Sequence, residues 1–213
     1  MSEDLLLYTL HQYSENQLWI NLSPEEKVLL EKLEQFKIQF NFPAVKNDVG
    51  QMLNFLTKAF SCKTIFEFGS GYGHSAFWYF VQNNHPPQKV YLTERRTDLQ
   101  DSFNSIKWSS ALDYFCGDAF ERLQQIEAID LCLLDGQKSQ YLEFLQKLIP
   151  RLNPGAIIVI DNAFIKGQFL DKDLQHKDIV QKTNELHQFL RNQKFEKVFM
   201  PVRDGLLILK KVN

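Results

Sequence analysis

The chain has 213 residues, 44% of them hydrophobic and 23% charged, and a formal net charge of −2 at pH 7. This length is enough for one α/β domain with a sizeable core, and the charge excludes a uniformly basic nucleic-acid-binding surface, although a local basic patch remains compatible with it. The N-terminus lacks the pattern of a signal peptide, and no apolar run approaches the roughly 18 residues of a membrane span. We therefore expect a cytoplasmic protein. In that reducing compartment the three scattered cysteines, Cys62, Cys116 and Cys132, are expected to be reduced thiols, with burial expected above all at Cys116 and Cys132.

The first 60 residues are predicted to form a helical segment that packs on a core of residues 61–213. Ser23-Pro24-Glu25-Glu26 is typical of a helix start, with a capping serine, proline at the first helical position and acids in the first turn. Apolar residues then recur at helical spacing: Val28, Leu29, Leu33, Phe36 and Phe40. A second helix is expected after Pro43.

From residue 64 onward, apolar runs alternate with segments of helical pattern. The expected strands lie near 64–68, 89–93, 113–116, 130–134 and 156–160, with helices between most of them. A helix is expected around 173–192, and then an antiparallel hairpin of Lys197–Val202 and Leu206–Val212. The order predicts an α/β fold in a single domain, residues 1–213, with a doubly wound, mostly parallel sheet, helices on both faces and the hairpin at one sheet edge.

A glycine-rich loop, Gly69-Ser-Gly-Tyr-Gly73, separates the first expected strand from a helix. Glycines there allow a ligand to approach the backbone, although a tight turn without a ligand would look the same. Glu94 ends the next strand about 20 residues on, where an acid can hold two ribose hydroxyls. Asp118, after the third strand, could border an adenine, cap the following helix, or do both. These features do not distinguish NAD from S-adenosylmethionine.

Two later strands each end in an aspartate, Asp135 and Asp161, and Asn162 follows the second. In a parallel sheet these residues would meet at one edge. Carboxylate and amide oxygens suit Mg²⁺ or Ca²⁺, whereas the alternative is that they cap a turn and a helix. Lys138 lies three residues after Asp135, on the same face of a helix beginning there, and could take a proton, although most lysines are solvated surface residues.

With these motifs the sequence resembles the metal-dependent class I S-adenosylmethionine O-methyltransferases. These include catechol and caffeoyl-CoA O-methyltransferases and bacterial tRNA 5-hydroxyuridine methyltransferases. The resemblance runs from about Val45 to the C-terminus. It rests on Val45 with Gly50-Gln51, Glu67–Ala76, Glu94, Gly117–Ala119, Asp135–Tyr141, Asn153–Gly155, Asp161-Asn162 with Gly167, and Asp204-Gly205.

The resemblance implies a Rossmann-like fold, S-adenosylmethionine as methyl donor, Mg²⁺ or another hard divalent cation, and a homodimer. It implies the following cofactor-binding residues: Val45, Glu67, Gly69, Gly71, Ser75, Glu94, Asp118, Ala119 and Asp135. It implies Asp135, Asp161 and Asn162 as metal ligands, and Lys138 as the catalytic residue.

The acceptor implied by the resemblance is a hydroxyl of a small phenolic or catechol-like molecule. The alternative is a 5-hydroxyuridine of tRNA, which would need a basic footprint such as Lys166, Lys172, Lys177 and Lys182, a stripe that interspersed acids weaken. Animal catechol enzymes carry an acid at the position of Leu207, so catechol itself is less expected. A non-catalytic cofactor-binding protein and an NAD-dependent dehydrogenase are the remaining alternatives.

Overall fold

The computed structural model describes residues 9, 12–13, 17–201 and 204–212, and these form a seven-stranded sheet in the order β3-β2-β1-β4-β5-β7-β6. The strands are β1 (Thr64–Phe68), β2 (Lys89–Glu94), β3 (Leu112–Cys116), β4 (Ile129–Leu134), β5 (Leu152–Ile160), β6 (Phe195–Met200) and β7 (Leu206–Lys211). The pairs among β1 to β5 are parallel, whereas β7 is antiparallel to both β5 and β6. The predicted Rossmann-like α/β fold with an antiparallel edge hairpin is confirmed.

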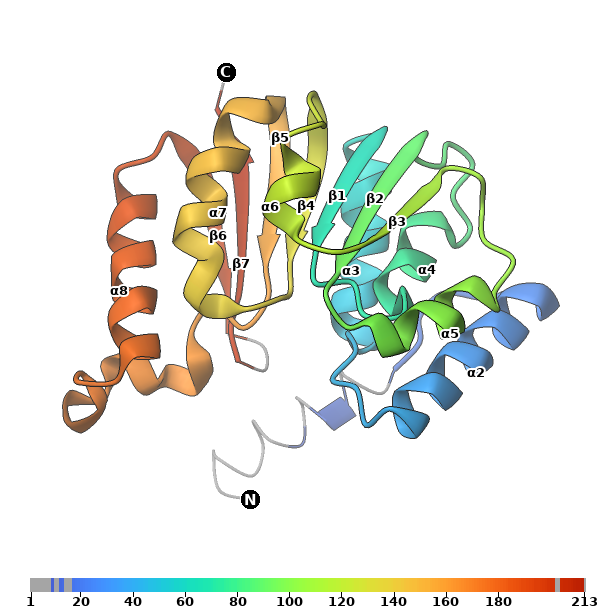
Figure 1. Cartoon of the computed structure of the whole chain (residues 1–213), viewed down its shortest axis with the longest axis horizontal. Helices are drawn as coiled ribbons and strands as arrows, with labels where there is room; N and C mark the ends of the chain where they lie inside the picture. Colours follow the sequence, from blue (N-terminus) through green and yellow to red (C-terminus); the bar gives the residue numbers. More distant parts are fainter. Residues whose placement is uncertain (1–8, 10–11, 14–16, 202–203, 213) are drawn as a thin grey trace.

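Helices cover both faces of this sheet (Figure 1). One layer contains α2 (Pro24–Gln39), α3 (Asn47–Ala59), α4 (His74–Phe80) and α5 (Gln100–Asn104). The opposite layer contains α6 (Ala119–Leu123), α7 (Tyr141–Leu148) and α8 (Asp178–Arg191). Short 3₁₀ segments lie at Thr97–Leu99, Lys138–Gln140, Ile149–Arg151, Ile165–Leu170 and Lys172–Leu174. Because strand side chains alternate between faces, each layer packs on its own set of buried strand residues.

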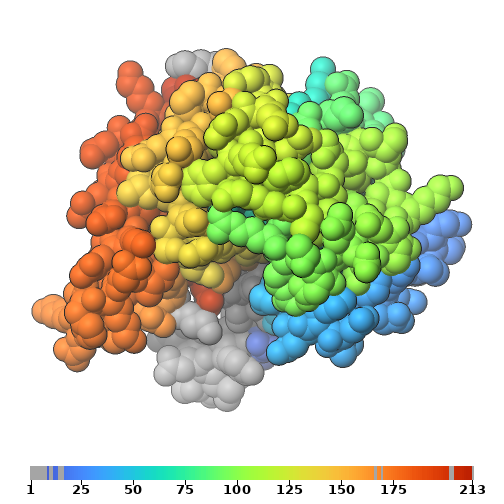
Figure 2. Space-filling model, in the orientation of Figure 1, coloured from blue at the N-terminus to red at the C-terminus, as the bar shows by residue number. Residues whose placement is uncertain are grey.

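The N-terminal helix α2 begins where the sequence predicts it. Ser23 and Glu26 form a reciprocal capping box, in which each side chain accepts a hydrogen bond from the other residue's backbone N–H. Leu33 is fully buried against the sheet layer, and the Lys32 amine donates to the Ser105 carbonyl at 2.7 Å. Figure 2 shows the resulting contact between the α2 segment in blue and the α5 segment in green.

The helical expectation for residues 1–60 holds only in part. Residues 42–46 and 17–19 are irregular, and much of the stretch before residue 17 lies outside the described residues. The helix expected around 173–192 begins instead at Asp178, because the Asp171 side chain accepts from the Asp173 N–H and starts a separate 3₁₀ turn. The first hairpin strand ends at Met200, and Arg203 lies outside the described residues.

The cysteines match the expectation of free thiols. Cys62 and Cys132 are buried, and Cys116 is half-buried near the carboxyl edge of the sheet. Burial raises the pKa of the Cys62 thiol to about 12, which makes it unreactive. Among the described helices, none combines the length and the apolar character that crossing a membrane would require.

Candidate functional site

One row of residues crosses all seven strands at the carboxyl edge of the parallel sheet. The strand register pairs Phe68 with both Thr93 and Leu134, and Leu134 with Ile160. The residue that follows each of these strand ends is therefore also a neighbour of the next one across the sheet. Two further pairs are direct: Glu94 with Cys116, and Met200 with Leu206. Together with the pairing of β5 and β7, they give the row Cys116, Glu94, Gly69, Asp135, Asp161, Leu206 and Met200. We call this set the edge row. It places the glycine loop, both strand-end aspartates and the hairpin side by side.

The glycine loop is built by backbone conformations and close approaches that other residues resist. Gly69 has a φ of +90°, and a Cβ there would lie 2.6 Å from the Cα of Gly136 in the loop after β4. Gly73, with a φ of +89°, is the N-cap residue of α4. The ends of β1 and β4 therefore meet backbone to backbone, which opens the space above them to a ligand.

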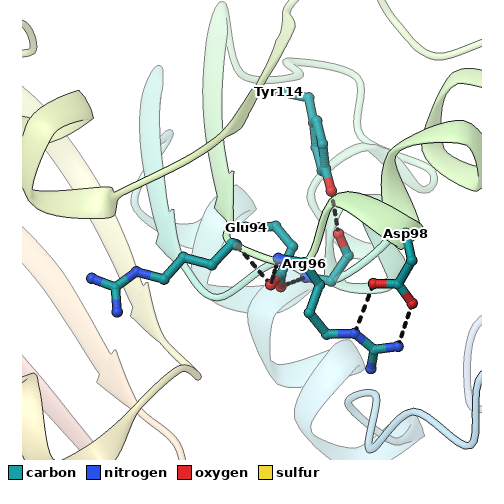
Figure 3. A network of polar contacts seen from close by, with 6 residues as sticks. Glu94, Arg96, Asp98 and Tyr114 are labelled. Carbon is teal, nitrogen blue, oxygen red and sulfur yellow. Dashed lines mark hydrogen bonds and ion pairs between the residues drawn. The ribbon is translucent and has the colours of Figure 1, made fainter.

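Glu94 holds this loop in place (Figure 3). One carboxylate oxygen accepts from the Gly71 N–H at 2.8 Å, and the other accepts from the N–H groups of Arg95 and Arg96 at 2.8 and 2.9 Å. The Tyr114 hydroxyl donates to the Gly71 carbonyl at 2.9 Å. Gly71 is thus bonded on both its donor and its acceptor side, and the predicted ribose-binding acid is already positioned by three backbone donors.

A pocket opens between the glycine loop and the ends of β2 and β4. Its lining consists of Phe42, Phe68, Gly69, Thr93, Glu94, Arg95, Gly117, Ala119, Asp135, Gly136, Gln137 and Gln140. Of the predicted cofactor-binding residues, Gly69, Glu94, Ala119 and Asp135 lie in this lining. Val45, Glu67, Gly71, Ser75 and Asp118 are not part of it. Sequence reasoning missed Phe42, Gln137 and Gln140, and no motif points to Phe42, whose ring packs on Gly71.

Glu67 supports the pocket from below rather than lining it. Its side chain is 1% exposed, and its carboxyl group accepts from the hydroxyls of Ser75 and, at 3.0 Å, Tyr79. Burial raises the pKa of Glu67 to about 7, although the two hydroxyl donors oppose the shift. This triad ties β1 to the first and second turns of α4, and so fixes the helix that follows the glycine loop.

Asp118 acts as a helix cap. Its side chain accepts from the Phe120 N–H at 2.8 Å, and it also pairs with Arg95 at 2.7 Å across the mouth of the pocket. His74, in the first turn of α4, is 2% exposed and contacts Glu34 of α2 at 2.8 Å. The His74 ring and α2 therefore brace the glycine loop from the side away from the pocket.

The two strand-end aspartates lie close to one another at the centre of the edge row. Leu134 and Ile160 are paired, and the Asp161 N–H donates to the Leu134 carbonyl at 3.0 Å. Burial raises the pKa of Tyr141 well above its usual value, and the negative charges of Asp135 and Asp161 add to this shift. The strand register therefore places the backbones of Asp135 and Asp161 side by side.

The donor chemistry of this pair and its neighbour fits a hard divalent cation. Asp161 is 2% exposed, and its Oδ1 accepts from the Asn162 N–H at 2.8 Å, which is also the turn-capping contact of the alternative interpretation. Asn162 has a φ of +55°, a conformation that asparagine tolerates better than most residues. No group of three His, Cys, Asp or Glu side chains suited to a metal is found among the described residues, but such a group would not include an amide.

Lys138 is half-buried, and the local structure around it differs from the expectation. No helix begins at Asp135: residues 135–137 are irregular, a 3₁₀ turn begins at Lys138, and α7 begins at Tyr141. The close approach of Gly136 to Phe68 and Gly69 holds this segment in an extended loop. The spacing argument for a shared helix face therefore fails, although Lys138 remains three residues from Asp135 along a short loop.

The chain also matches a known protein family and its solved structures. A sequence model described as O-methyltransferase matches residues 20–212. Caffeoyl-CoA O-methyltransferase 1 of Arabidopsis thaliana is 22% identical, with 100% of this chain and 86% of that protein covered. Catechol O-methyltransferase of Niastella koreensis is 25% identical over 61% of this chain and 62% of its own length. The crystal structure of the O-methyltransferase TomG from Streptomyces achromogenes, in complex with SAM, superposes with a TM-score of 0.79 at 18% identity and covers 100% of both chains.

Proposed function

Because the chain belongs to the O-methyltransferase family, we propose that it transfers a methyl group from S-adenosylmethionine to a hydroxyl of a small phenolic or catechol-like acceptor, with the help of a divalent cation. The observation that carries this proposal is the edge row. In this row the glycine-loop pocket, the two strand-end aspartates and the apolar hairpin are neighbours. A methyl donor and an acceptor bound on either side of the carboxylates would then face one another.

On the donor side, residues of the chain bind S-adenosylmethionine and orient it. Glu94 accepts hydrogen bonds from the ribose hydroxyls, using the lone pairs that its three backbone donors leave free. Gly69 and Gly71 let the methionine end approach the backbone, and Ala119 borders the adenine. Val45, Ser75 and Glu67 act indirectly in this scheme, because all three are buried and none lines the pocket.

At the centre, Asp135, Asp161 and Asn162 would hold the cation. A divalent ion such as Mg²⁺ acts as a Lewis acid that lowers the pKa of an acceptor hydroxyl. Lys138 accepts the hydroxyl proton or stabilises the resulting oxyanion. Holding the two reactants in line is expected to contribute several kcal/mol more.

A tRNA acceptor receives less support from the charges of the described residues. Lys182 forms an ion pair with Asp178 at 3.2 Å, and the exposed Lys172 and Lys177 alternate with acids. The side chain of Lys166 lies outside the described residues. Salt-sensitive binding of tRNA together with loss of one methoxyuridine in cells lacking the protein would favour the tRNA alternative.

The direct test is a methyl-transfer assay with labelled S-adenosylmethionine, Mg²⁺ and a panel of phenols and catechols, with and without EDTA. We expect EDTA-sensitive methylation of at least one acceptor. Failure to bind S-adenosylmethionine in calorimetry would contradict the proposal. Size-exclusion chromatography with light scattering tests the homodimer that the family resemblance implies.

A further inference from the structure

A hollow on the α2 side of the sheet lies apart from the edge row. It opens between the N-terminal half of α2, the last turn of α4 and the loop that follows α5, three elements on the same face of the sheet (Figure 1). Its volume is about 140 Å³, close to the roughly 150 Å³ of a cavity that holds benzene. The hollow therefore has room for one aromatic ring. It is lined by Glu26, Leu29, Phe77, Phe80, Val81, Lys107, Trp108 and Ser109.

The walls of this hollow are mostly apolar. Phe77 is 3% exposed, whereas Leu29, Phe80 and Trp108 are only half-buried. The Trp108 indole N–H donates to the Phe103 carbonyl at 3.0 Å, which fixes the orientation of the indole ring. Apolar side chains that stay partly exposed around a concave surface are stabilised when an apolar ligand covers them. These walls therefore favour a ring over a polar occupant.

The two charged residues of the lining differ in whether they have partners. Glu26 is the capping-box acid of α2, and its two carboxylate oxygens accept from the backbone N–H groups of Ser23 and Gln82 at 2.8 and 2.9 Å. Lys107 is exposed, and no hydrogen bond or ion pair joins its amine to another residue in the described part of the chain. The hollow therefore presents an unpaired cation at its rim, which favours an anionic group on the occupant.

A stack of aromatic rings joins this hollow to the glycine loop. The Trp108 ring stacks on Phe103 with the ring centroids 5.3 Å apart, and Phe103 stacks on Tyr114 at 4.1 Å. Tyr114 is the residue whose hydroxyl donates to the Gly71 carbonyl (Figure 3). Phe103 and Trp108 also lie against Gly73, where an added Cβ would be 3.0 and 3.2 Å from their rings. Restricting the Trp108 ring therefore restricts the packing against which the glycine loop rests.

We propose that this hollow is an effector site for a small aromatic carboxylate, whose ring lies between α2 and α4 and whose carboxylate pairs with Lys107. Through Trp108, Phe103 and Tyr114, the occupant favours the arrangement of the glycine loop that binds S-adenosylmethionine. By linkage, the cofactor tightens binding of the effector by the same factor. The inference goes beyond the proposed methyl transfer, because neither effector binding nor its coupling to the cofactor requires that reaction to occur.

The first measurement compares benzoate with benzamide, which has nearly the same shape and no charge. In calorimetry we expect benzoate to bind the wild-type chain about 5-fold more tightly, the upper end for an ion pair with an exposed lysine. Lys107→Gln should reduce this preference to less than about 2-fold. Lys27→Gln, at an exposed lysine of α2 that does not line the hollow, should keep it. Equal binding of the two probes to the wild-type chain, or an equal loss of preference in both variants, would overturn the site.

The second measurement tests the link to the glycine loop. Saturating benzoate should tighten binding of S-adenosylmethionine to the wild-type chain about 5-fold, at the lower end of typical coupling between sites. Tyr114→Phe removes only the hydroxyl that reaches Gly71, and should bind benzoate normally while losing most of this effect. An unchanged cofactor affinity in the wild-type chain, or an effect that survives intact in Tyr114→Phe, would overturn the effector role. If the chain binds no S-adenosylmethionine, the proposed function fails, whereas benzoate binding and its dependence on Lys107 still decide whether the site exists.

Discussion

The two halves of the edge row differ in whether the carboxylate oxygens in and beside them have hydrogen-bond partners. In the cofactor half, formed by the ends of β1, β2 and β3, Glu94 and the supporting Glu67 accept hydrogen bonds at both oxygens. In the acceptor half, formed by the ends of β5, β6 and β7 with the first turn of α3, one oxygen of Asp48 has no partner among the described residues. The carboxylates of the first half are therefore held by hydrogen bonds within the chain, whereas the second half retains a buried carboxylate oxygen without such a partner among the described residues.

This difference agrees with what each half would have to recognise. A methyl donor common to a whole family can be held by backbone groups and a prearranged acid, because its shape does not vary. Acceptors do vary, and a second pocket beside the hairpin is lined by side chains from segments far apart in sequence, among them Trp19, Asp48 and Met200. A substitution at the centre should reduce methyl transfer itself, whereas a substitution in the cofactor half should change cofactor binding or the stability of the chain.

The largest effect is expected at the boundary between the halves. Asp161→Asn removes a buried carboxylate beside Asp135 and should reduce methyl transfer about 1,000-fold, or about 4 kcal/mol, while binding of S-adenosylmethionine changes little. Single-turnover assays and calorimetry measure the two quantities. Asp101→Asn serves as the control. A variant with normal turnover that EDTA still abolishes would contradict the metal assignment.

The next effect concerns Glu67 in the cofactor half and the pH dependence of the free energy of unfolding. The pKa of Glu67 is about 7 in the folded chain against 4.5 for an ordinary glutamate, so the folded state holds more protons between these values. The free energy of unfolding should therefore fall as pH rises from about 4.5 to about 7, by up to roughly 3 kcal/mol, and stay level above that window.

Glu67→Gln tests this pH dependence, because an amide resembles the protonated acid and does not titrate. Urea unfolding at pH 5 and pH 8 should show a smaller difference in the variant than in the wild type. Tyr79→Phe, which keeps the carboxyl group, should retain the slope. An equally steep slope in Glu67→Gln would mean that another group causes it.

A smaller effect is expected at Glu94, the residue that joins the glycine loop to the proposed ribose site. Glu94→Gln replaces an acceptor with an amide donor facing backbone N–H groups, and should weaken binding of S-adenosylmethionine about 30-fold, or about 2 kcal/mol. Asp98 belongs to the same network but contributes only an exposed ion pair with Arg96. The control variant Asp98→Asn should therefore change the affinity less than about 2-fold. Equal losses would show that the whole network, rather than Glu94, sets the affinity.

The cofactor half could largely be predicted from the sequence. Apolar runs located all five parallel strands to within a few residues, and the topology of such sheets fixes where their carboxyl ends lie. Gly69, Glu94 and the two aspartates follow strands directly, so their place in the edge row needed no knowledge of packing. Local sequence and one topological rule were sufficient.

The remaining features depend on contacts between distant segments. Glu67 looks like a strand residue of either face until α4 is packed on β1 and brings Ser75 and Tyr79 to it. Asp48 looks like an ordinary first-turn acid, and only the antiparallel hairpin brings Met200 near it. The loop after Asp135 was predicted as helix because the close approach of Gly136 to the end of β1, which leaves no room for a Cβ, has no local sequence signal.

The smallest effect tests whether helix α2 contributes to the order of the glycine loop before the cofactor binds. Glu34 on α2 contacts His74 at the start of α4, and the hydrogen bond from His74 is the main cause that lowers the Glu34 pKa to about 2. This stabilisation is present above about pH 4.5 and is lost as pH falls toward 2. Because the Glu34 side chain is 41% exposed, solvent screening limits the contribution to about 1 kcal/mol.

Glu34→Gln should therefore lower the free energy of unfolding by about that amount at pH 7 and by much less near pH 2.5. The control is Glu31→Gln, at an exposed acid on the same helix, which should have no such effect. If Glu34→Gln also weakens cofactor binding, the order of the glycine loop depends on α2; if it lowers stability alone, the loop is fixed by Glu94 and Tyr114 without help from the N-terminal helix.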